Sequence, residues 1–328
     1  MKVTNKYGLP DAFVQAVSVE RHNKAGCYSA TTLNKGVKEI ILQARHWDEL
    51  ETDASDNVWA IFGSALHSVM QSKAETFLMP LFRSFIAGLD DEDEDGHKRF
   101  AEKMIEYIKF RAAIDAFVEE SFSENVSNSV VTGQIDSYNI DSGTIVDWKT
   151  SSVYKVLLQD FNDWRQQGMT YAWLLRRNGL PARKCRFIAL LKDHSKSKAR
   201  FESGYPKSPV FVYEFDVTQQ ELERHGEWIA AKVAALEAAE KLADDEIEPC
   251  SAAERWASDD KYAVMKEGRK SAVRVLDTAE DANDLAERLG KGHYVEFRAG
   301  EPRKCADYCL CKNFCNFYKG LKNGKGNG

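Results

Sequence analysis

The sequence contains no segment that could span a membrane and no secretion signal. No apolar run approaches the roughly 20 residues that a spanning helix needs, and the opening MKVTNKYGLPDAF lacks the apolar core of a signal peptide. The phosphate-binding pattern GxxxxGK followed by Ser or Thr is also absent, so any ATP-driven motor must be a separate protein. No internal repeat is present. These absences predict a cytoplasmic protein without such a motor.

An excess of positive charge is also lacking. The chain has 45 Lys and Arg against 51 Asp and Glu, and its formal net charge is -6. A nucleic-acid partner would need basic residues that are locally concentrated. Such groups lie at 176–186, 192–200 and 261–274, while the acidic run Asp90 to Asp95 holds much of the negative charge. Ordinary solvated surfaces have similar runs, so charge alone does not identify the partner.

The pattern of apolar residues predicts an α/β protein. Helical spacing covers about 29–50, about 59–85 with a break or bend near Pro80, and 98–120. VSNSVVTGQIDSYNI and TIVDWKTSS then predict a hairpin around a DSG turn. A helix over 160–178, the strands CRFIALLK and PVFVYEFDV, and a helix over 218–244 capped by Thr218 complete a mixed sheet flanked by helices.

These elements predict three regions. The first, 1–245, is a core with a helical part (1–122) followed by the sheet and its helices (123–245). With 328 residues and 43% hydrophobic content, one large domain with additions is favoured over several small ones. The second region, 246–318, is an irregular cysteine-rich tail with little periodicity. The third, 319–328, has a composition that predicts disorder.

The predicted hairpin places two carboxylates on one face of the sheet. If Ile140 pairs with Gly143, Asp136 lies opposite Asp147, and Lys149 projects from the same face because side chains alternate along a strand. Like charges across a ladder destabilise it unless a cation compensates them. Oxygen ligands of this kind suit Mg²⁺ or Mn²⁺. The alternative is that these three residues are solvent-facing neighbours.

The seven cysteines are unevenly distributed. Four of them, Cys305, Cys309, Cys311 and Cys315, fall within eleven residues. In a reducing compartment such a cluster indicates metal binding more than disulfides. Thiolate ligands permit zinc or an iron-sulfur cluster. Cys185 begins an apolar strand, where we expect it to be buried.

Four motifs together resemble those of a known family. GQIDSY and IVDWKTSS resemble the second and third motifs of the PD-(D/E)XK nucleases, in which Asp136, Asp147 and Lys149 occupy the motif positions. The segment from Gly63 to His67 resembles the upstream GxxxH motif, and Gln167 to Tyr171 the downstream QxxxY motif. The combination is similar to the RecB-like exonuclease branch. It implies a restriction-endonuclease-like sheet over about 29–217.

The resemblance also implies roles for individual residues. The ligands of Mg²⁺ or Mn²⁺ would be His67, Asp136, Asp147 and the backbone carbonyl of Trp148. Lys149 would orient or help deprotonate the attacking water and offset charge on the phosphate. Gln167 and Tyr171 share one helical face, from which they could reach Lys149 or the DNA backbone. A simpler role for that face, packing Tyr171 into the core, is compatible with this one.

The cysteine tail is similar to that of RecB-like nucleases that hold a 4Fe–4S cluster, among them CRISPR-adaptation exonucleases. By this resemblance Cys305, Cys309 and Cys315 are ligands, with zinc as the alternative metal. The usual fourth cysteine lies near the N-terminus, before the GxxxH helix. We favour Cys250 as the fourth ligand, then Cys311, then Cys27. A closed site of four thiolates would be structural and not hydrolytic.

The implied function is metal-dependent DNA exonuclease activity in phage or bacterial recombination, repair or defence, with a separate helicase or recombinase as a partner. One alternative is a DNA endonuclease with the same catalytic residues. A second alternative is a non-catalytic iron-sulfur module that binds DNA or senses redox state.

Overall fold

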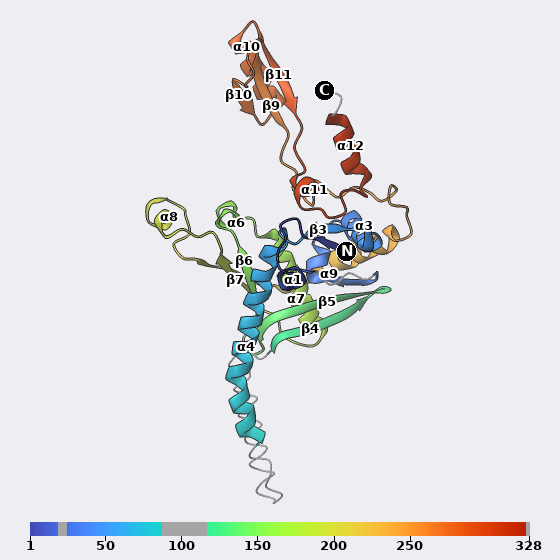
Figure 1. Cartoon of the computed structure of the whole chain (residues 1–328), viewed down its shortest axis with the longest axis vertical. Coiled ribbons are helices and arrows are strands. Elements are labelled where there is room, and N and C mark those ends of the chain that lie inside the picture. Colours follow the sequence, from blue (N-terminus) through green and yellow to red (C-terminus); the bar gives the residue numbers. More distant parts are fainter. Residues whose placement is uncertain (19–24, 87–116, 326–328) are drawn as a thin grey trace, which may run out of the picture. The chain divides into compact units, whose positions relative to one another are not determined.

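A computed structural model describes residues 1–18, 25–86 and 117–325 (Figure 1). The chain divides into two compact units, of which the first contains 1–34 and 47–240, and the second contains 35–46 and 241–328. The second unit thus takes in a short segment that was predicted to belong to the core. Within the described residues, no helix is both long and apolar enough to cross a bilayer. The predicted roles of the regions as nuclease core and iron-sulfur tail stay predictions.

The first unit is built on a mixed sheet, as predicted, and this sheet has six strands. The strand order is β2–β5–β6–β7–β8, and β4 also pairs with β5. Pairing is parallel for β2 with β5 and for β6 with β7, and antiparallel for the other neighbours. The strands are β2 (Cys27–Ser29), β4 (Phe117–Val126), β5 (Ser129–Asn139), β6 (Thr144–Ser151), β7 (Lys184–Leu191) and β8 (Val210–Asp216).

The β5–β6 hairpin has the predicted register. Ser137 lies opposite Val146 and Asn139 opposite Thr144, which is the pairing obtained by counting from the DSG turn. Gly143 takes a left-handed φ of 64° in that turn, a conformation that glycine adopts without steric cost. Continuing this register by one position brings Asp136 next to Asp147.

The helices before the sheet differ from the prediction in their bounds. The expected helix over 29–50 is divided into α2 (Ala30–Leu33) and α3 (Val37–Arg45), because Gly36, the residue before α3, has an extended backbone. Helix α4 (Val58–Ile86) is continuous through Pro80. The acidic run lies outside the described residues, and so does the part of the expected helix 98–120 that ends at residue 116. The prediction of a helix is wrong for 117–120, because these residues begin β4.

The two longer helices after β6 lie close to their predicted positions. Helix α7 (Asn162–Arg177) follows the short α6 (Val153–Leu158), and α9 (Gln219–Ala239) begins at a capping box. Thr218 accepts a hydrogen bond from the Glu221 amide, and the Glu221 side chain bonds back to Thr218. The other elements of this unit are β1 (Lys2–Thr4), α1 (Asp11–Ala16), a 3-10 turn (Trp47–Glu49), β3 (Glu51–Asp53) and α8 (Lys196–Phe201).

Helix α7 packs directly on the sheet because two glycines leave room for it. A Cβ atom on Gly133 of β5 would lie 2.7 Å from Leu174 Cδ1 and 2.9 Å from Tyr171 Cδ1. A Cβ on Gly168 would lie 3.0 Å from the Phe187 ring. Leu174, Tyr171 and Phe187 are buried. This close packing sets the face of α7 that carries Gln167 and Tyr171 against the strands of the predicted site.

Stability of the first unit should depend on pH through His225. Its imidazole is half-buried between α9 and α7, and Nε2 lies 2.9 Å from the Thr170 hydroxyl. Burial lowers the pKa of His225 to about 4. Because the unfolded chain binds this proton more readily, we expect the stability to be fully present above about pH 6.5 and to fall by about 2–3 kcal/mol toward pH 4. Urea unfolding at several pH values should show a smaller loss for His225→Gln than for the wild type, and equal losses would contradict the assignment.

The second unit contains a folded subdomain where an irregular tail was predicted. Three antiparallel strands in the order β10–β9–β11 pack with helix α10. Three consecutive residues of β9, Ala263 to Met265, are buried, so the strand lacks the alternation that would have revealed it. The elements of this unit after α3 are β9 (Lys261–Lys266), β10 (Arg274–Leu276), α10 (Ala279–Leu289), β11 (His293–Arg298), α11 (Arg303–Asp307) and α12 (Asn316–Lys325).

Helix α12 also corrects the disorder predicted from residue 319 onward, although residues 326–328 lie outside the described part of the chain. Its first turn packs through Phe317, whose ring centroid lies 4.0 Å from the Arg255 guanidinium carbon. Composition alone did not reveal this contact.

Candidate functional site

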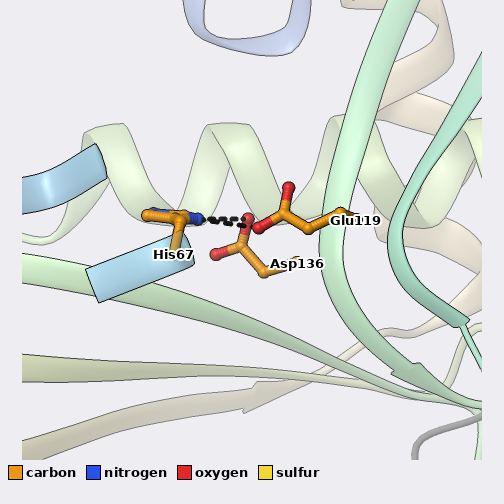
Figure 2. A group of neighbouring side chains, drawn as sticks. All are labelled: His67, Glu119 and Asp136. Atoms are coloured by element: carbon orange, nitrogen blue, oxygen red, sulfur yellow. Dashed lines mark hydrogen bonds and ion pairs between the residues drawn. The ribbon is translucent and has the colours of Figure 1, made fainter. Parts of the chain in front are cut away.

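Three side chains from three elements converge in the first unit. His67 comes from α4, Glu119 from β4 and Asp136 from β5 (Figure 2). His67 Nδ1 lies 3.1 Å from Glu119 Oε1 and 3.3 Å from Asp136 Oδ1. One ligand atom from each residue falls within 4.8 Å of the other two. An imidazole nitrogen and two carboxylates form a donor set that suits a divalent cation.

Electrostatics in this group favour a cation. The hydrogen bond to Asp136, together with the charges of Asp136 and Glu119, raises the pKa of His67 to about 9, although burial opposes the shift. The two carboxylates therefore hold a proton on the imidazole at neutral pH. The same carboxylates would attract a metal ion.

Glu119 is the member of the group that was not predicted. Val118 pairs with Ser137 and Glu120 with Ile135, which places Glu119 beside Asp136 without a ladder pair of its own. Its φ is 53°, in the left-handed region. That conformation costs a non-glycine residue of order 1–3 kcal/mol, and such residues cluster at functional sites. The predicted helix over 98–120 concealed Glu119, and no motif in the sequence marks it.

Asp136 is oriented by the strand that carries the other predicted residues. Its Oδ2 accepts a hydrogen bond of 2.7 Å from the Trp148 amide, which leaves Oδ1 toward His67. Along one edge of β5, the described strand partners are β2 up to Thr132 and β6 from Ser137 onward. Asp136 lies in the interval between them, where its side chain can reach the backbone of β6. The predicted use of the Trp148 carbonyl as a ligand stays a prediction.

Asp147 and Lys149 form a second, adjoining group with the α7 residues. Lys149 Nζ lies 2.6 Å from Asp147 Oδ2 and donates to Gln167 Oε1 at 2.9 Å. Gln167 Nε2 donates to Asp147 Oδ1 at 3.0 Å and to the Tyr171 hydroxyl at 2.7 Å. The four predicted residues are therefore in direct contact. Asp147, predicted as a metal ligand, is here paired with Lys149 and is not in the group of His67.

The charge of Asp147 is sensitive to these neighbours. Burial raises the pKa of its carboxyl group, the Lys149 ammonium lowers it, and the Asp136 carboxylate raises it again. Asp147 is 1% exposed. The net effect is a raised pKa for Asp147, and Lys149 opposes the shift by favouring the ionised form. Lys149 also places an ammonium next to the carboxylates of the site.

A second candidate site lies within the second unit. Five cysteines line one cavity together with Lys38, Glu39, Arg255 and Lys312, and these cysteines are Cys250, Cys305, Cys309, Cys311 and Cys315. The Sγ atoms of Cys309 and Cys311 are 3.5 Å apart, and the Cys311 thiol donates to the Glu39 carbonyl at 3.7 Å. The concentration of thiols and the cationic lining fit an anionic thiolate-bound metal or cluster.

Cys250 enters this cavity at the beginning of α3. A Cβ atom on Gly36 would lie 2.4 Å from Cys250 Sγ, so the thiol depends on a glycine at this position. The other two cysteines lie in strands of the first unit: Cys27 is in β2, and Cys185 is fully buried in β7. Burial of Cys185 was predicted. The ligand roles of the five cavity cysteines stay predictions.

Comparisons with known proteins identify the family. The sequence matches the PD-(D/E)XK nuclease superfamily over residues 41–316, and no curated protein matches it. Solved structures that match part of this chain include LHK-Exo in complex with dAMP (10% identity, TM-score 0.30, 70% of this chain and 94% of that one). A phage-related exonuclease from Haemophilus somnus 129PT has 14% identity and a TM-score of 0.23, covering 51% of this chain and 78% of that one. The match over 41–316 spans most of the sequence and shows that the chain belongs to the PD-(D/E)XK nuclease superfamily.

Proposed function

We propose that this protein is a DNA exonuclease that depends on Mg²⁺ or Mn²⁺. The observation that carries the proposal is the arrangement of His67, Glu119 and Asp136 next to the Asp147–Lys149 pair, in a superfamily whose members use divalent metals. The imidazole and the carboxylates would hold the cation. Once bound, it would polarise the phosphoryl oxygen and make a water more acidic.

The remaining residues would orient the reactants. Lys149 lies within reach of the Asp147 carboxylate and Gln167, a position from which its ammonium could orient the attacking water and offset charge on the phosphate. Gln167 bridges Lys149, Asp147 and Tyr171. Gln167 would therefore act as a positioning residue that fixes the side chains of Lys149 and Asp147 relative to each other.

End-labelled linear DNA and closed circular DNA of the same sequence provide the test. With Mn²⁺ or Mg²⁺, the protein should release nucleotides from the linear substrate and leave the circle intact, and EDTA should stop the reaction. Cutting of the circle would instead favour an endonuclease. DNA binding with no cleavage of either substrate in any divalent metal would favour a non-catalytic module.

Glu119 should contribute to metal affinity. Replacing it with glutamine removes one negative charge and one carboxylate ligand from the group around His67. We expect the affinity for Mn²⁺ to fall by at least about 10- to 100-fold, the loss that follows when a residue that only supports a metal ligand is replaced. Titration of free Mn²⁺ by electron paramagnetic resonance measures this directly. Glu120→Gln changes the exposed neighbour on β4 and should leave the affinity unchanged. Equal Mn²⁺ affinities for Glu119→Gln and Glu120→Gln would show that Glu119 does not bind the metal.

We also propose that the cavity in the second unit holds a 4Fe–4S cluster, with zinc as the alternative. Three thiolates would come from Cys305, Cys309 and Cys315, and the fourth from Cys250 or, as the alternative, Cys311. The cluster would be structural, because four thiolates close the coordination of the site. Iron, sulfide and zinc analysis after anaerobic purification tests it. A protein that contains zinc and no iron would show that the cavity holds zinc and not an iron-sulfur cluster.

A further inference from the structure

Two large aromatic rings lie exposed at the beginning of the helix that carries His67. Trp59 is 53% exposed and Phe62 is 55% exposed, and their ring centroids are 5.5 Å apart. We call these two residues the ring pair. Exposure of two adjacent rings on one helix turn is unfavourable in water, so the ring pair is a candidate contact surface.

One member of the ring pair, Trp59, lies on the same side of α4 as His67. Trp59, Gly63 and His67 follow one another at intervals of four, so they share one side of the helix. The axial separation of Trp59 and His67 is about 12 Å at the usual helical rise. A Cβ atom on Gly63 would lie 3.9 Å from Thr150 Oγ1, which brings this side of α4 to the strand residue that follows Lys149. The Trp59 ring thus lies on the side of α4 that leads to His67.

A basic segment contacts Trp59 of the ring pair. Lys192 Nζ lies 4.3 Å from the Trp59 ring centroid, and the Lys192 amide donates to the Ser151 carbonyl at the end of β6. Lys192 begins the basic run 192–200, which continues into α8 with exposed Lys196 and Arg200. The run ends next to Phe201, which is 83% exposed. An ammonium held against an exposed indole is a combination that suits a flat ring attached to an anionic backbone.

We propose that Trp59 and Phe62 stack bases of a single-stranded DNA segment next to the metal-binding group, while Lys192 contacts its phosphates. This inference rests on the proposed nuclease function and deepens it, since it names the form of DNA that the site takes. Stacking on aromatic rings is tolerant of sequence, because every base has a π face. The ring pair would therefore hold a separated strand without selecting its sequence.

The chemistry of the surface favours a nucleic-acid strand over a protein helix as its occupant. A protein helix would bury an apolar stripe and gain little from the ammonium at Trp59. A single strand uses both features at once, because its bases stack and its phosphates pair with Lys192. In a base-paired duplex the bases are already stacked on one another and their faces are not available to the rings.

Binding of fluorescein-labelled oligothymidylate in EDTA, measured by anisotropy, tests the inference without cleavage. Replacing Trp59 or Phe62 with alanine should weaken binding by about five- to hundredfold, the range for loss of one stacked base. Trp59→Phe keeps a ring and should remain within about threefold of the wild type. Tyr294→Ala removes a half-exposed ring from β11 and serves as the matched control.

An oligonucleotide of the same length with abasic sites identifies the contact as stacking. The wild type should bind it more weakly than oligothymidylate, and Trp59→Ala should add no further loss. Lys192→Met should instead lower the slope of log affinity against log salt by about one while Trp59→Ala leaves that slope unchanged. Unchanged oligothymidylate binding by Trp59→Ala and Phe62→Ala would overturn the inference, as would equal losses for both strands or no binding by the wild type.

These results are separable from those that test the nuclease function. Strand binding in EDTA does not require the metal-binding group, so a protein that binds oligothymidylate through the ring pair but cleaves nothing would disprove only the proposed reaction. A protein that cleaves linear DNA, but whose Trp59→Ala and Phe62→Ala variants bind oligothymidylate as tightly as the wild type, would disprove only the role of the ring pair.

Discussion

Replacing Lys149 with methionine should lower metal-dependent cleavage of linear DNA by about 10²- to 10⁴-fold, the usual effect of losing a group that takes part in proton transfer. The ammonium of Lys149 is 2.6 Å from Asp147 and 2.9 Å from Gln167, so its loss removes a positive charge from the position where charge would develop on the phosphate. Mn²⁺ affinity should fall much less, because Lys149 is not a ligand. Initial rates and Mn²⁺ titration on the same preparation measure both effects.

Two further variants separate chemistry from folding. Lys149→Met leaves a buried carboxylate without its cation, and breaking such a pair costs about 3–5 kcal/mol, so thermal unfolding must accompany the assay. Lys149→Arg keeps the charge beside Asp147 and should restore stability without restoring full cleavage, because the guanidinium differs in shape. Lys155→Met removes another lysine paired with an aspartate, Asp163, and should cleave normally. If Lys149→Met is folded and cleaves linear DNA at the wild-type rate, Lys149 takes no part in the reaction.

The hairpin shows how far local patterns can specify a site. Its register follows from one glycine-containing turn and the alternation of side chains, so the sequence alone suffices to place Asp136, Asp147 and Lys149 near one another. Gln167 and Tyr171 can likewise be placed on one helical face, because they are four residues apart. The contact between Gln167 and Lys149 requires α7 to pack closely on the sheet. This packing depends on Gly133 and Gly168, whose neighbours no local pattern reveals.

Local sequence patterns could not predict that Glu119 joins the site. They also could not predict that Asp136 contacts His67 while Asp147 contacts Lys149. Glu119 meets Asp136 because β4 pairs along β5 and takes a left-handed residue at that point. Nothing in the segment FVEESFSENV distinguishes this glutamate from those at 120 and 124. Asp147 was predicted to share a metal with Asp136 from the hairpin register and the motif resemblance, and this role stays a prediction. Its contact with Lys149 depends on the packing around β6. Long-range packing decides which carboxylate meets which cation.

The same limit applies to the second unit. Spacing showed that the tail cysteines could act together, and the cavity brings Cys250 among them. The participation of 35–46 could not be predicted, because α3 reaches the tail through tertiary contacts. Lys38 donates to the Ile247 carbonyl and to Asn316, and Glu39 pairs with Lys304 at 2.6 Å. A segment that was assigned to the core thus forms one wall of the cysteine cavity.

Gly36→Ala should displace Cys250 and reduce the iron content of the purified protein to well below that of the wild type. The added methyl group would lie 2.4 Å from Cys250 Sγ and 3.0 Å from its Cβ, so one of the two residues must move. The backbone conformation of Gly36 is one that alanine also adopts, since φ is -65° and ψ is 147°. Overpacking of this kind costs about 1–3 kcal/mol. Iron and sulfide per chain, visible absorption and thermal unfolding measure the effect.

Gly320→Ala is the matched control, because a Cβ atom at that helical position meets nothing within 4 Å. It should retain the wild-type iron content and stability. Cys250→Ser should lose iron as Gly36→Ala does if Cys250 is the fourth ligand, whereas Cys311→Ser should then retain it. If Cys250→Ser keeps its iron and Cys311→Ser loses it, the fourth thiolate is Cys311. In that case Gly36→Ala would still lower the unfolding temperature through the clash, but would leave the iron content nearly unchanged, so stability and iron content together identify the ligand.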